Sequence, residues 1–139
     1  MNGTPHQNKQ YDWKGKTILI AEDMESSNYY FEAALRKTNV NILWAVNGKQ
    51  AVEKVENNKD IQAVLMDINM PEMNGLEATR KIRKIRNDLP VIVQTAYVLS
   101  HEEEKSYEFG ANAFMSKPIK LNDLLETLDE FLSKPVATS

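Results

Sequence analysis

Short apolar runs alternate along this chain with longer segments in which apolar residues recur every three or four positions. The short runs have the length of buried strands, and the longer segments have the spacing of helices that are apolar on one face. The expected strands are Thr17–Ala21, Asn41–Ala45, Ala63–Met66, Val91–Gln94 and Ala113–Ser116. This alternation predicts an α/β domain in which helices cover both faces of a parallel sheet.

One helix is expected after each strand, which makes a single domain of strand–helix units. The fourth helix, Ser100–Phe109, is unusually polar and should end at Gly110, because glycine commonly terminates helices. The other four carry an apolar stripe at helical spacing. The stripes consist of Tyr30, Phe31, Ala34 and Leu35, of Ala51, Val52 and Val55, of Leu76, Ala78, Ile82 and Ile85, and of Leu121, Leu124, Leu125, Leu128, Phe131 and Leu132.

The two ends of the chain lack this periodicity. Residues 1–13 begin with a stretch rich in Asn, Gln, Gly, Pro and His, which cannot build a core, so we expect a disordered tail or a linker there. We place the domain at residues 14–133 and a second disordered tail at 134–139. A chain of 139 residues is long enough to bury roughly two thirds of its unfolded surface.

Composition and charge narrow the class of protein. The chain is 42% hydrophobic and 27% charged, as is usual for a soluble domain, and it has no cysteine for disulfides or thiolate chemistry. A net charge of −3 gives no reason to expect nucleic-acid binding. We interpret the basic run from Arg80 to Arg86 as a solvated helix face, with Ile82 and Ile85 toward the core. Because no apolar stretch approaches the ~20 residues of a membrane span, we expect a cytoplasmic protein without membrane contact.

Polar residues able to do chemistry follow four of the expected strands. Glu22 and Asp23 come after the first strand, Asp67 after the third, Thr95 after the fourth and Lys117 after the fifth. Ligands of open parallel sheets bind at the carboxyl ends of the strands. We therefore expect these side chains to converge at one edge of the sheet.

The chemistry of such a cluster can be inferred from the residue types. Carboxylates ~4 Å apart repel each other by about 1–4 kcal/mol unless one is protonated or a cation joins them. An all-oxygen site suits a hard ion such as Mg²⁺. Lys117 offers a compact positive charge for a phosphoryl oxygen, and Thr95 offers a hydroxyl donor. This combination predicts phosphoryl transfer, with Asp67, alone at the end of the central run, as the nucleophile.

In order and at the scale of the whole domain, these motifs resemble the receiver domain of bacterial two-component response regulators. The resemblance spans about Lys16 to Leu132. It implies a flavodoxin-like, doubly wound sheet of five parallel strands in the order 2-1-3-4-5, with five helices. The segments that carry it are Glu22-Asp23, Asn47-Gly48-Lys49-Gln50-Ala51, Val64 to Gly75, Thr95-Ala96, Gly110-Ala111 and Lys117-Pro118.

The resemblance also implies roles for the acidic residues. Asp67 would accept a phosphoryl group from a histidine kinase. Mg²⁺, for which Mn²⁺ can substitute, would be coordinated by Asp23, Asp67 and the backbone carbonyl of Asn69, with Glu22 acting mostly through water. Glu22 stands where many members have Asp, so its carboxylate has a different reach. Asn69 and Tyr97 would flank the phosphoryl group, where side chains can tune hydrolysis.

For the switch, the resemblance implies that Thr95 and Lys117 bind the phosphoryl oxygens. Thr95 would move toward the phosphate, and Phe114 would turn inward after it. Because Phe114 has no hydroxyl, the change would be transmitted by packing alone. The family also tends to have a cis peptide bond at the position of Lys117-Pro118.

Three other functions fit parts of the pattern. A phosphohydrolase with an aspartyl nucleophile would carry a second Asp two residues later, where this chain has Asn69. A flavodoxin-like electron carrier would need a phosphate-binding loop after the first strand, and the acidic segment Glu22–Glu25 has the wrong charge for it. A degenerate receiver that serves only for protein contacts is disfavoured by the intact site residues.

Two contexts remain open for a receiver. The chain is either a free-standing single-domain regulator or part of a hybrid histidine kinase that passes phosphate to a histidine phosphotransfer protein. The lead-in Tyr11–Lys16, with no output domain after Leu132, favours the hybrid kinase. A weak phosphorylation-linked dimer through the last helix and its neighbouring strand is compatible with the sequence, although the polar fourth helix gives it little hydrophobic drive.

Overall fold

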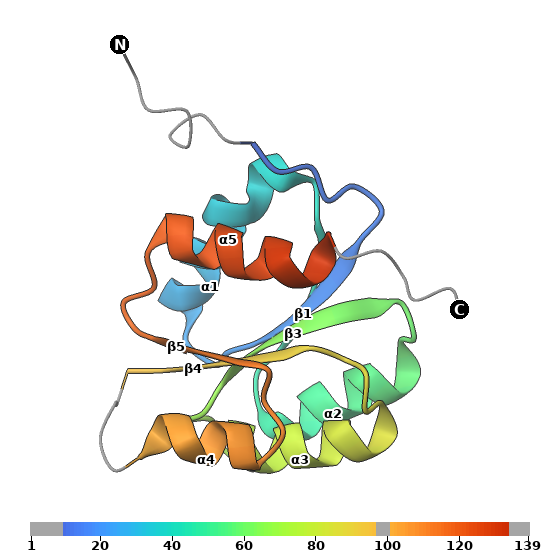
Figure 1. The fold of residues 1–139 in the computed structure, drawn as a ribbon, viewed down its shortest axis with the longest axis vertical. Coiled ribbons are helices and arrows are strands. Elements are labelled where there is room, and N and C mark those ends of the chain that lie inside the picture. Colours follow the sequence, from blue (N-terminus) through green and yellow to red (C-terminus); the bar gives the residue numbers. More distant parts are fainter. Residues whose placement is uncertain (1–9, 97–100, 134–139) are drawn as a thin grey trace.

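A five-stranded parallel sheet forms the centre of the computed structural model, which describes residues 10–96 and 101–133 (Figure 1). The strands lie in the order β2-β1-β3-β4-β5, and every neighbouring pair is parallel. The fold class and the strand order are therefore confirmed. The strands are β1 (Thr17–Ala21), β2 (Asn41–Ala45), β3 (Ile61–Asp67), β4 (Val91–Thr95) and β5 (Ala113–Ser116).

Helices cover both faces of this sheet. The face covered by α1 and α5 lies opposite the face covered by α2, α3 and α4 (Figure 1). None of the helices that the structure describes is both long and apolar enough to cross a membrane. The helices are α1 (Glu25–Leu35), α2 (Gly48–Asn57), α3 (Gly75–Ile85), α4 (Glu102–Glu108) and α5 (Leu121–Leu132), with a short 3-10 helix, η2 (Arg36–Thr38), after α1.

The central strands β1, β3 and β4 are buried on both faces, which explains why their sequences read as continuous apolar runs. Successive side chains point to opposite faces of the sheet. Ile18 and Ile20 accordingly join the core beneath α1 and α5, whereas Leu19 joins the core beneath α2 and α3. The same alternation puts Gln94 on the face of Ile92, beneath α1 and α5.

Two close backbone approaches fix the loops that lead to the carboxyl edge of the sheet. A Cβ atom on Gly75 would clash with the backbone oxygen of Asp67, so only glycine lets the start of α3 lie against the end of β3. A Cβ atom on Gly48 would clash in the same way with the backbone of Met73. The starts of α2 and α3 are thereby held against the loop that follows Asp67.

The packed region begins earlier than the sequence predicts. Trp13, placed in the N-terminal tail, is only 1% exposed and belongs to the core beneath α1 and α5. Its backbone N–H donates to the carbonyl of Thr38, and its indole Nε1–H donates to Asp129 Oδ1 at 3.0 Å. A buried indole with a hydrogen-bond partner is a stable anchor, so the packed region includes Trp13, one residue before the predicted start of the domain. Residues 1–9 and 134–139 lie outside the described residues.

Smaller differences concern the helices. Ile85 is 39% exposed rather than turned to the core. Asn47 accepts a hydrogen bond from the Gln50 N–H and caps α2, where the sequence indicated only a turn. Of the helix expected within Ser100–Phe109, α4 starts at Glu102, and Ser100 lies outside the described residues.

The basic run in α3 is not a uniformly solvated face. Arg86 donates to the backbone oxygen of Ile61 at 2.8 Å, which ties α3 to the start of β3. Arg83 is half-buried, and its guanidinium connects the loops that precede β4 and β5 by hydrogen bonds to both. Its acceptors are the backbone oxygens of Arg86, Asn87, Leu89 and Gly110 and the side-chain oxygen of Asn112.

Candidate functional site

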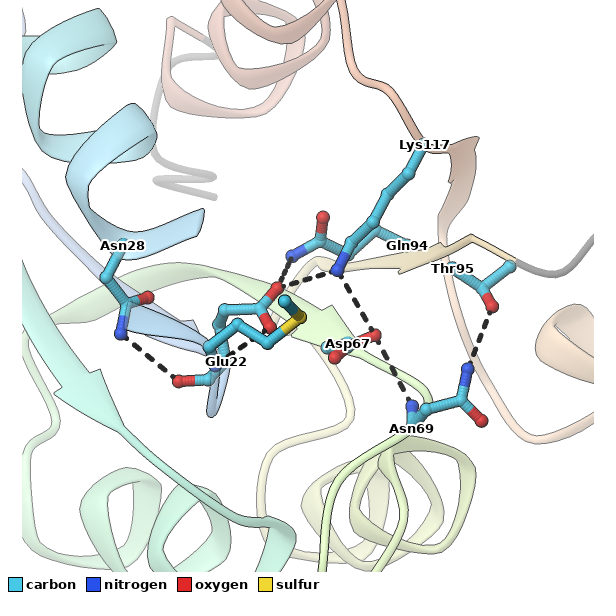
Figure 2. A network of polar contacts seen from close by, with 8 residues as sticks. Glu22, Asn28, Asp67, Asn69, Gln94, Thr95 and Lys117 are labelled. Atoms are coloured by element: carbon cyan, nitrogen blue, oxygen red, sulfur yellow. Dashed lines mark hydrogen bonds and ion pairs between the residues drawn. The ribbon is translucent and has the colours of Figure 1, made fainter. Parts of the chain in front are cut away.

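Side chains of opposite charge gather where the strands end (Figure 2). Glu22 and Asp23 follow β1, Asp67 ends β3, Thr95 ends β4 and Lys117 follows β5. The parallel sheet brings these residues to one edge because all of its carboxyl ends meet there. The structure thus assembles the five side chains that the sequence placed at strand ends.

Three carboxylates share a small volume at this edge. One oxygen each of Glu22, Asp23 and Asp67 lies within 4.8 Å of the others. Glu22 and Asp67 are 0% and 4% exposed, whereas Asp23 is exposed, so the cluster meets solvent on the side of Asp23. Such a concentration of negative charge is stabilised by a cation, and an all-oxygen donor set suits Mg²⁺. These residues therefore fit the metal that we expected from the sequence.

The ammonium group of Lys117 lies between two of the carboxylates. Its Nζ donates to Glu22 Oε1 at 2.9 Å and lies 3.8 Å from Asp67 Oδ1. The lysine is therefore bound more closely to Glu22 than to Asp67. One ammonium cannot balance three ionised carboxylates, so the site retains a negative charge when all of them are ionised. The peptide bond that follows, Lys117–Pro118, is cis.

The surroundings of Asp67 shift the pKa of its carboxyl group. Burial and the nearby carboxylate of Glu22 raise the pKa of Asp67 from its ordinary value of 3.8 to about 7. Two groups lower this pKa: the ammonium of Lys117, and the backbone N–H of Asn69, which donates to Asp67 Oδ1 at 3.3 Å. A cation beside Asp67 would favour its charged form. Binding of a metal beside Asp67 would therefore be coupled to deprotonation of its carboxyl group.

Asn69 also connects the loop after β3 to the end of β4. Its side-chain Nδ2 donates to Thr95 Oγ1 at 3.2 Å, and Thr95 is fully buried (Figure 2). The resemblance implies a metal-binding role for the backbone carbonyl of Asn69 and a place for its side chain beside the phosphoryl group, and the side-chain contact with Thr95 adds to that expected site. Phe114, on β5, is half-buried and packs against the core beneath α2 and α3. Tyr97 lies outside the described residues.

Two residues that the sequence analysis does not single out lie against Glu22. Gln94 Nε2 lies 3.5 Å from Glu22 Oε1, and Asn28 Nδ2 donates to the backbone carbonyl of Glu22 at 3.3 Å. The sequence contained a signal for Gln94, because an amide in a buried apolar strand is costly unless it is bonded. It contained none for Asn28, because a polar residue near the start of a helix is ordinary.

Comparison with known proteins gives the family. The model of the response regulator receiver domain matches residues 18–129 of this chain. The polar-differentiation response regulator DivK of Brucella anthropi is 30% identical over 84% of this chain and 96% of its own length. Histidine kinase 3 of Arabidopsis thaliana is also 30% identical, over 89% of this chain, but the chain spans only 14% of that kinase.

A solved structure extends the likeness to three dimensions. The receiver domain of the sensor histidine kinase PA1611 from Pseudomonas aeruginosa PAO1 is 32% identical, with a TM-score of 0.79. The match covers 86% of this chain and 99% of that one, and that structure has a magnesium ion coordinated in its active-site cleft. The relatives thus include both a single-domain regulator and receiver domains of kinases.

Proposed function

This chain belongs to the family of response regulator receiver domains, and from that membership we propose that Asp67 accepts a phosphoryl group from a histidine kinase in a Mg²⁺-dependent reaction. The domain is a signalling module of two-component systems. One observation carries the proposal: the carboxylates of Glu22, Asp23 and Asp67 lie within 4.8 Å of one another, beside the ammonium of Lys117.

In the proposed reaction, a carboxylate oxygen of Asp67 attacks the phosphorus of a phosphohistidine and forms an acyl phosphate. The P–N bond breaks, and the imidazole nitrogen leaves with the electron pair and takes up a proton. Lys117 would bind a phosphoryl oxygen, since its Nζ lies 3.8 Å from Asp67 Oδ1. Mg²⁺ on Asp23, Asp67 and the backbone carbonyl of Asn69, with Glu22 acting through water, would supply the positive charge that Lys117 cannot.

Thr95 and Phe114 are the proposed relay of the phosphorylated state. The Thr95 hydroxyl accepts from Asn69 Nδ2 at 3.2 Å, and a move toward a phosphoryl oxygen would exchange that contact for a charge-assisted one. Phe114 is half-buried and would pack inward as Thr95 moves. A change of partner binding on the face of β5 and its neighbouring helices would follow.

We propose that the domain works as the receiver of a hybrid histidine kinase in the cytoplasm and passes its phosphoryl group to a histidine phosphotransfer protein. The likeness to receiver domains of histidine kinases supports this setting. The alternative is a free-standing regulator, which the match to nearly the whole of DivK supports. Transfer of the phosphoryl group from Asp67 to a purified histidine phosphotransfer protein would favour the hybrid-kinase setting.

The test of the donor chemistry uses phosphoramidate, whose P–N bond models that of phosphohistidine. With Mg²⁺, the wild-type protein should acquire an acyl phosphate detectable by ³¹P NMR and cleaved by hydroxylamine. EDTA should prevent its formation. The Asp67→Asn variant, nearly isosteric with the wild type, should remain unlabelled while its circular dichroism is unchanged. Labelling of that variant at wild-type stoichiometry would contradict the proposed acceptor.

A further inference from the structure

Gln94 is the buried polar residue that the proposed function leaves unexplained. It is 0% exposed and stands in β4 among Val91, Ile92, Val93 and Thr95. Leaving one end of a buried amide without a hydrogen-bond partner destabilises the folded state. Within the described part of the chain, the side-chain oxygen Oε1 of Gln94 has no hydrogen-bond partner. The fold therefore carries an energetic penalty at this position.

The other end of the Gln94 amide faces the site. Its Nε2 lies 3.5 Å from Glu22 Oε1, the oxygen that also accepts from Lys117 Nζ at 2.9 Å (Figure 2). An ionised carboxylate can only accept, so the NH₂ end must face Glu22, and Oε1 is left without a donor. At 3.5 Å the contact is long, and it acts mainly as an amide dipole aimed at a buried charge.

We infer that Gln94 is a positioning residue, which together with Lys117 holds the Glu22 carboxylate in place for the metal at the expense of folding stability. Glu has one more side-chain torsion than Asp, so its carboxylate has more freedom to lose when it is fixed. Partners behind metal-binding carboxylates commonly orient them and raise metal affinity. This inference rests on the proposed function, because it requires Mg²⁺ to bind beside Glu22.

The Gln94→Met variant separates the two effects, because methionine has a similar length and no amide. In EDTA, its thermal unfolding midpoint should be higher than that of the wild type, since the unpartnered oxygen is gone. Its Mg²⁺ affinity, measured by amide NMR shifts during titration, should be about 10-fold weaker. A residue with a purely structural role would not shift these two quantities in opposite directions. Gln94→Leu provides a second apolar variant for the case in which Met packs poorly.

Gln62 offers a matched control within the same sheet. Its side-chain oxygen is also buried without a partner among the described residues, but it lies near the amino end of β3, away from the site. Gln62→Met should raise the unfolding midpoint and leave Mg²⁺ affinity within twofold of the wild type. In a Glu22→Ala background, Gln94→Met should cause no further loss of Mg²⁺ affinity.

The outcomes separate failure of this inference from failure of the proposed function. A wild-type protein that shows no saturable Mg²⁺ shift would contradict the proposed function itself. If the wild type binds Mg²⁺ and both Gln94 variants bind it within twofold, the positioning role is overturned. The role is also overturned if the loss persists in full in the Glu22→Ala background, or if both variants unfold at a lower temperature than the wild type.

Discussion

Two half-buried cations, Lys117 and Arg83, lie at opposite ends of the sheet and have different kinds of acceptor. Arg83, near the amino ends of β4 and β5, donates only to neutral oxygens, four from the backbone and one from Asn112. Lys117, at the carboxyl edge, lies against the carboxylates of Glu22 and Asp67, with the carboxylate of Asp23 close by.

The difference indicates which end of the sheet does chemistry. The nitrogens of the Arg83 guanidinium donate to fixed oxygens of the protein, so these donors are occupied by the fold. Around Lys117 the carboxylates outnumber the cation. Burial, together with the nearby carboxylate of Glu22, raises the pKa of Asp67 to about 7. In the proposed function, a further cation and then a phosphoryl group would bind there. The acceptors of each cation therefore distinguish a structural anchor from a reactive site better than residue type does.

The largest effect is expected at Lys117. The Lys117→Met variant keeps the apolar stem and removes the charge, so phosphorylation by acetyl phosphate should slow by at least about 100-fold. Initial rates follow from the gain in intact mass over time. Lys120→Met, which alters an exposed lysine a few residues further on, should react at the wild-type rate. A Lys117→Met rate within threefold of the wild type would remove the lysine from the reaction.

Arg83→Met tests the other half of the comparison. Loss of the guanidinium removes a donor from several part-buried backbone oxygens, so the free energy of unfolding should fall by about 2–4 kcal/mol, measured in urea. Arg80→Met is the control: Arg80 lies over the Phe109 ring at 4.0 Å but is exposed, and its loss should cost less than about 1 kcal/mol. If folded Arg83→Met lost Mg²⁺ affinity, the separation of the two regions would be wrong.

Stability against pH provides the next test, in metal-free protein. Because the pKa of Asp67 rises from 3.8 to about 7 on folding, the folded state holds an extra proton between these values. Folding stability should therefore fall as pH rises from about 4 to 7 and then level off. At pH 8 the free energy of unfolding of Asp67→Asn should exceed that of the wild type by about 1–3 kcal/mol, allowing for solvent screening. Its free energy of unfolding should also fall less as the pH rises. If the stability of both proteins fell equally with rising pH, Asp67 would not be the group that causes the pH dependence.

The smallest of these effects is expected at Asp23. This carboxylate is exposed, so Asp23→Asn should leave folding unchanged while it weakens Mg²⁺ binding at least about tenfold. Glu25→Gln removes an exposed acid in the first turn of α1 that is outside the carboxylate cluster, and should bind Mg²⁺ normally. Indistinguishable titrations of Asp23→Asn and the wild type would exclude Asp23 from the metal shell.

The sequence was sufficient to predict the edge of the sheet at which Asp67 and Lys117 meet. Strand ends are visible in the hydrophobic pattern, and parallel topology brings them together. The pairing of Lys117 with Glu22 could not be predicted, because it depends on side-chain torsions that periodicity does not determine. The same limit applies to Arg83, which looks solvated in a basic run and is buried by loops distant in sequence. Trp13 was misplaced because an indole at the end of a polar segment gives no sign of its partner, Asp129.

Intact mass after incubation with acetyl phosphate, with Mg²⁺ or with EDTA, tests the central claim most directly. The wild-type protein should gain one phosphoryl group with Mg²⁺ and none with EDTA, and Asp67→Asn should gain none in either case. Peptide mapping of the modified wild type should place the added mass on Asp67. A Mg²⁺-dependent gain that survives in Asp67→Asn, or maps to another residue, would contradict the assignment of Asp67 as the phosphoryl acceptor.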